Sequence, residues 1–159
     1  MSGGGGLAAL QCAATAILLS FSASGVARFG AALFLLCAGA ASLMTIPDSW
    51  FSTLLVVIAL GVLACALPIY RPGGVPAGLA IPIAAGTGAA AGLALAAGGG
   101  RSSPAVLLTV LLFIGGRQVV LAGYPLVPKV IAGWLVAIAM LSAALPIVSV
   151  PGYSATHMD

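Results

Sequence analysis

The sequence predicts an all-α, polytopic transmembrane helix bundle of about six spans, folded as a single membrane domain with no extramembrane domain. Of the 159 residues, 62% are hydrophobic and only 4% are charged. A soluble domain carries roughly 25% charged residues, so this chain cannot cover a water-exposed surface of its size. Six spans of ~20 apolar residues account for most of the length, and the remainder matches the short polar breaks between them.

The first three spans are separated by charged residues and proline. We expect Arg28 to mark the break between the first and second spans, and Pro47 with Asp48 to mark the break between the second and third. The third span ends at Arg71, because the proline that follows cannot continue the helical hydrogen-bond ladder. The resulting spans are 7–27, 29–46 and 50–70.

The last three spans are expected at 75–98, 105–124 and 130–150. The fifth is interrupted by Arg117 and Gln118, and the apolar stretch before this pair is too short to cross a membrane alone. A broken or re-entrant helix at this point, leaving five full spans, is the alternative to six.

The basic residues predict the orientation of the bundle. The turns after the first, third and fifth spans each contain a basic residue (Arg28, Arg71 and Lys129), which is the pattern of three α-hairpins. Because positively charged loops stay in the cytoplasm, the N-terminus and the C-terminus are both predicted outside. The Ala- and Gly-rich composition is typical of a high-GC bacterial coding sequence, so we expect the cytoplasmic (inner) membrane of a bacterium.

The fourth span is the richest in small residues, and its glycines recur four residues apart. Small residues at this spacing let two helix backbones approach closely, which favours a central packing helix. The alternative is a moving helix that lines a solute path, with a proline releasing a backbone carbonyl. The candidate helix-packing residues are Gly74, Gly78, Gly88, Gly92 and Pro82.

Arg117 is the one charge well inside a predicted span. It lies seven residues before Tyr124, or roughly 10 Å deep, and an extended arginine can reach much of that way to the headgroups. Otherwise its charge costs at least ~2.5–3.5 kcal/mol near the bilayer centre, and it faces protein, a wet cavity or an anion. Arg117, with its neighbour Gln118, is therefore the candidate contact for a ligand, a lipid or a partner subunit.

The chemistry missing from the spans restricts the function. No predicted span contains Asp, Glu, His or Lys. That excludes a carboxylate proton relay, a Ser-His-Asp centre and a histidine-bound metal or haem. The three cysteines have no metal-ligand spacing. We therefore expect no enzyme activity, no catalytic or metal-binding residues and no cofactor.

Two functions remain. The first is a structural or accessory subunit, or an assembly partner, within a larger membrane complex. The alternative is a compact transporter or channel for a neutral, apolar or anionic small solute. In either case the expected partners are the lipid bilayer and other membrane subunits or a second copy of the chain. Nucleic acid is excluded, because its binding needs a dense basic patch.

Overall fold

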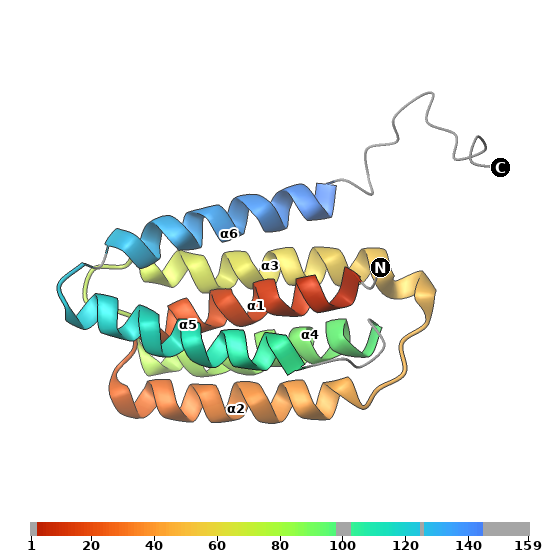
Figure 1. Ribbon diagram of the computed structural model, residues 1–159, viewed down its shortest axis with the longest axis horizontal. Coiled ribbons are helices and arrows are strands. Elements are labelled where there is room, and N and C mark those ends of the chain that lie inside the picture. Colours follow the sequence, from red (N-terminus) through yellow and green to blue (C-terminus); the bar gives the residue numbers. More distant parts are fainter. Residues whose placement is uncertain (1–2, 98–102, 125, 145–159) are drawn as a thin grey trace.

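The computed structural model describes residues 3–97, 103–124 and 126–144, and these form an all-helical bundle (Figure 1). This confirms the predicted all-α class. Four of the helices, α2, α3, α4 and α6, are long and apolar enough to cross a membrane. Within these described ranges, the six α-helices are α1 (Gly3–Ser20), α2 (Ser24–Ser42), α3 (Phe51–Ile69), α4 (Ala77–Ala97), α5 (Ser103–Leu121) and α6 (Leu126–Ala144), with a 3-10 turn, η1 (Asp48–Trp50), before α3.

Arg28, expected at the break between the first and second spans, lies inside a helix, and Arg117 does not break the fifth helix as the five-span alternative requires. Helix α1 ends at Ser20 and α2 begins at Ser24, so Arg28 lies one turn inside α2. Helix α5 continues through Arg117 and Gln118 without interruption. The physical reason is that arginine has a high helix propensity and keeps its backbone N–H, so its charge alone ends no helix. Two of the turns instead contain glycines with positive φ, among them Gly74 and Gly123.

The three hairpin turns gather at one end of the bundle, the left end in Figure 1. The backbone N–H of Val75 donates to the carbonyl oxygen of Phe21 at 3.4 Å, which joins the first turn to the second. The hydroxyl of Tyr70 donates to the carbonyl oxygen of Lys129 at 3.0 Å, which ties the second turn to the start of α6. Arg28, Arg117 and Lys129 therefore lie within about a turn of the same end of the bundle.

Helices α2 and α4 make the most extensive helix pair of the bundle. A Cβ atom added at Gly88 would collide with the backbone of Phe34, and one added at Gly92 would collide with the backbone of Ala38. The two helices therefore touch backbone to backbone. Helix α1 lies in the middle and packs on α3, α4 and α5, while α6 packs mainly on α3.

Residue size, rather than polarity, separates the inside of the bundle from the outside. More than half of the buried apolar residues that the structure describes are alanines. Large apolar side chains face outward instead, such as Leu36, Leu60 and Leu141, which are 71%, 59% and 64% exposed. Soluble monomers rarely expose so much apolar surface, whereas membrane helices bury small residues against one another. The apolar helices thus suggest a membrane-embedded protein.

Candidate functional site

A buried polar cluster links α1, α3 and α4. The Oγ1 atoms of Thr15 and Thr87 lie 2.9 Å apart, and the Sγ of Cys65 lies 3.8 Å from the Oγ1 of Thr15. The Thr87 hydroxyl reaches the carbonyl oxygen of Ile83 at 2.8 Å. Because each hydroxyl has one proton, these contacts can form a chain in which Cys65 donates to Thr15, Thr15 to Thr87, and Thr87 to Ile83. The chain is satisfied within the protein and holds three helices together.

Gln11 adds an amide to this region. Its side chain is fully buried, and within the described part of the chain neither amide atom has a hydrogen-bond partner. The amide lies against Gly61 of α3, where an added Cβ would be 2.5 Å from the Nε2 of Gln11. Gly61 therefore provides the space that Gln11 occupies.

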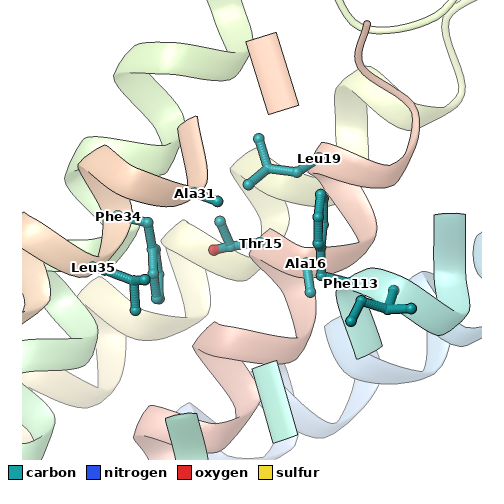
Figure 2. Close-up of a pocket in the computed structure, with 8 residues that line it drawn as sticks. Thr15, Ala16, Leu19, Ala31, Phe34, Leu35 and Phe113 are labelled. Atoms are coloured by element: carbon teal, nitrogen blue, oxygen red, sulfur yellow. The ribbon is translucent and has the colours of Figure 1, made fainter. Parts of the chain in front are cut away.

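An apolar groove runs between α2 and α5, with α1 as its floor (Figure 2). Its volume is about 220 Å³. In Figure 2, Thr15 and Leu19 of α1 lie between Phe34 of α2 and Phe113 of α5. The groove reaches the outer surface, because Leu35 on one wall is 46% exposed. The full lining is Thr15, Ala16, Leu19, Ala31, Phe34, Leu35, Phe113 and Ile114.

A second cavity, of about 210 Å³, is lined by two arginines. Ser24, Arg28, Phe113 and Arg117 line it, and Phe113 also lines the apolar groove. We call this second cavity the dibasic pocket. No acidic side chain is among those that the structure describes, so within that part of the chain both guanidinium groups lack a counter-charge.

The two arginines reach the dibasic pocket from equivalent positions. Arg28 lies four residues after the start of α2, and Arg117 lies four residues before the end of α5. The start of α2 and the end of α5 lie at the same end of the bundle (Figure 1). Of the two residues that the sequence singled out here, Arg117 is half-buried in the pocket, whereas Gln118 is exposed and is not among the lining residues. Sequence reasoning missed Arg28 as a site residue.

The glycines and proline of the fourth span fall into three places. Gly88 and Gly92 pack against α2. Gly74 lies in the turn before α4, at φ +85°, beside the carbonyl oxygen of Phe21. Gly78 and Pro82 are exposed on the outer face of α4, and a Cβ at Gly78 would meet nothing within 4 Å.

Comparisons with protein-family models, with curated proteins and with solved structures find no match to this chain.

Proposed function

We propose that this protein is a non-catalytic integral membrane protein of the bacterial inner membrane, and that it acts as an accessory subunit or assembly partner in a larger membrane complex. Six helices form six spans in this proposal. The three turns with their basic residues face the cytoplasm, and both termini lie outside.

The observation that carries the proposal is an outward stripe on α4 formed by two glycines and a proline. Gly78, Pro82 and Gly86 follow one another at four-residue spacing, so they lie on one face of the helix. All three are exposed, and a Cβ at either glycine would meet nothing within 4 Å. Another helix can approach closely where no large side chain stands in the way. The stripe therefore favours docking of a helix from another subunit or from a second copy.

The bundle interior also supports a structural role. Gln11, Thr15 and Thr87 are at most 4% exposed. Two of these side chains hydrogen-bond within the bundle, and none of the three faces solvent. Interhelical hydrogen bonds of this kind hold membrane helices together. A channel for polar solutes needs such groups to line a wet path instead.

The test is to place large side chains on the stripe and to measure whether the protein still assembles. In membranes from the native host, solubilised in a mild detergent, we expect the wild-type chain to migrate on a native gel well above its own mass of 15.4 kDa plus detergent. The double variant Gly78→Leu with Gly86→Leu is expected to fall to the monomer position. Gly39→Leu is the matched control, since Gly39 of α2 is also exposed and open but lies outside the stripe. Wild-type protein at the monomer position, or a double variant that stays assembled, would contradict the proposal.

The dibasic pocket favours a second candidate, a compact carrier for an anionic solute. Two arginines without a described counter-charge are typical of an anion site in a membrane protein. If Arg117→Ala leaves the assembly intact but abolishes anion flux in liposomes, the carrier replaces the accessory subunit as the function. If flux is absent from the wild-type protein, the carrier is excluded.

A further inference from the structure

We infer that the groove between α2 and α5 binds one anionic glycerophospholipid, with its headgroup phosphate on Arg28 and Arg117 and one acyl chain along the apolar floor. This inference does not depend on the accessory-subunit proposal, because that proposal concerns the exposed stripe on α4 and this one concerns the groove between α2 and α5.

The charges of the dibasic pocket call for an anion. Arg28, which is exposed, and Arg117, which is half-buried, line one cavity, so their like charges repel each other there. A phosphate between them replaces this repulsion with attraction. Guanidinium groups match phosphate oxygens in a two-pronged geometry, so arginine suits this role better than lysine.

The depth of the pocket matches a lipid headgroup. Each arginine lies four residues, or roughly 6 Å, from the end of its helix. With the turns at the membrane surface, this places both guanidinium groups near the boundary between the headgroups and the hydrocarbon. Long basic side chains near helix ends normally reach that boundary.

The groove supplies the apolar half of the site. Phe113 lines both cavities, so the apolar groove adjoins the dibasic pocket. Along α2, the site extends from Arg28 to Leu35, seven residues or roughly 10 Å toward the membrane interior. Leu35 and Ile114 are 46% and 53% exposed, so the groove opens sideways to the bilayer and an acyl chain can enter from there.

The size of the groove decides between a lipid and a protein partner. An α-helix with its side chains is about 10–12 Å across. A groove of about 220 Å³ between two helices is too small for a helix but holds part of one acyl chain. A free inorganic anion would use the arginines and leave the apolar floor without a role. An amphiphile with a phosphate headgroup uses both.

The test measures which lipid stays bound. The full chain is reconstituted in nanodiscs with equal amounts of phosphatidylglycerol and phosphatidylcholine of identical acyl chains, and retained lipids are counted by native mass spectrometry. We expect one retained phosphatidylglycerol and little phosphatidylcholine. Arg28→Gln with Arg117→Gln should lower phosphatidylglycerol retention at least roughly tenfold, given the gain per basic residue at an anionic surface. Arg71→Gln, an exposed arginine in the second turn, should leave it unchanged.

A second pair of variants tests the groove separately from the charges. Ala31→Phe fills the groove and should also lower retention, whereas Ala32→Phe places the same ring on the neighbouring exposed position, outside the groove lining, and should not. The single variants Arg28→Gln and Arg117→Gln, each with a partial loss, replace the double variant if it does not fold.

Three results would overturn the inference. Equal retention of the two lipids, or unchanged retention in the arginine variants, would show that the arginines do not select the headgroup. Unchanged retention in Ala31→Phe would show that the acyl chain lies elsewhere. Displacement of phosphatidylglycerol by millimolar inorganic phosphate would show that the pocket takes the free anion.

Discussion

Replacing Gly88 with alanine tests whether α2 and α4 are held by direct backbone contact. The added Cβ would lie 2.9 Å from the Cα of Phe34 and 3.1 Å from its carbonyl carbon, with the Phe34 carbonyl oxygen closer still. Non-bonded carbon atoms prefer roughly 3.5–4.0 Å. The helices must therefore separate by roughly 0.5–1 Å at this level, because the obstructing atoms belong to a backbone and not to a flexible side chain.

The magnitude follows from the cost of overpacking a well-packed interior, roughly 1–3 kcal/mol. The matched control is Gly86→Ala, two residues earlier on the same helix, where a Cβ meets nothing within 4 Å. Both variants gain the same helix propensity, roughly 0.5–1 kcal/mol, so it cancels in the comparison. At roughly 2–4 °C per kcal/mol for a chain of this size, Gly88→Ala should melt ~2–12 °C below Gly86→Ala.

The assay is thermal unfolding in detergent, followed by the loss of the monodisperse size-exclusion peak. Gly88→Ala should also weaken α2 selectively, so that amide hydrogens of α2 exchange faster while those of α6 do not. Equal melting temperatures for the two variants would refute the close approach of α2 to α4, and with it the packing role of Gly88.

Two further predictions concern the centre of the bundle and its orientation. Gly61→Ala should destabilise the protein, because the added Cβ meets the fully buried amide of Gln11. Adding Gln11→Ala should restore part of the lost stability. A double-mutant cycle by thermal unfolding measures the coupling, and additive losses would argue against the contact. Single cysteines at Ser2 and Ser154, in a background without native cysteines, should react with a membrane-impermeant maleimide from outside the cell, and protection of both would reverse the proposed orientation.

The sequence predicted the helices well because length and composition alone define them. Six apolar stretches of about span length became six helices, and the prolines and glycines of the second turn ended α3 near the expected residue. The first turn differs because the charge of Arg28 predicts a break there, although arginine continues a helix readily. The turn lies instead directly after Ser20, at residues that do not end a helix by their type alone.

Which side of each helix is buried is harder to predict. In the helices of a soluble bundle, apolar residues recur every three to four positions and so mark the buried side. In α4, glycine and alanine occur on every side, so Gly88 against α2 and Gly86 on the outer surface look alike in the sequence. Only the neighbours distinguish them, and these are set by how whole helices pack.

Of the two arginines that line the dibasic pocket, the sequence predicts only one as a site residue. Arg117 stands out in the sequence because a charge inside a span is costly, whereas the sequence predicts Arg28 in a turn, where it needs no partner. Once the first turn moves to residues 21–23, both arginines lie one turn inside the same end of the bundle, on helices separated by a groove. Each alone can reach the headgroups by extending its side chain. Because both residues line one cavity, a single anion bound there can contact both arginines. The pairing of Arg28 with Arg117 therefore favours a specific anionic lipid over general contact with the bilayer.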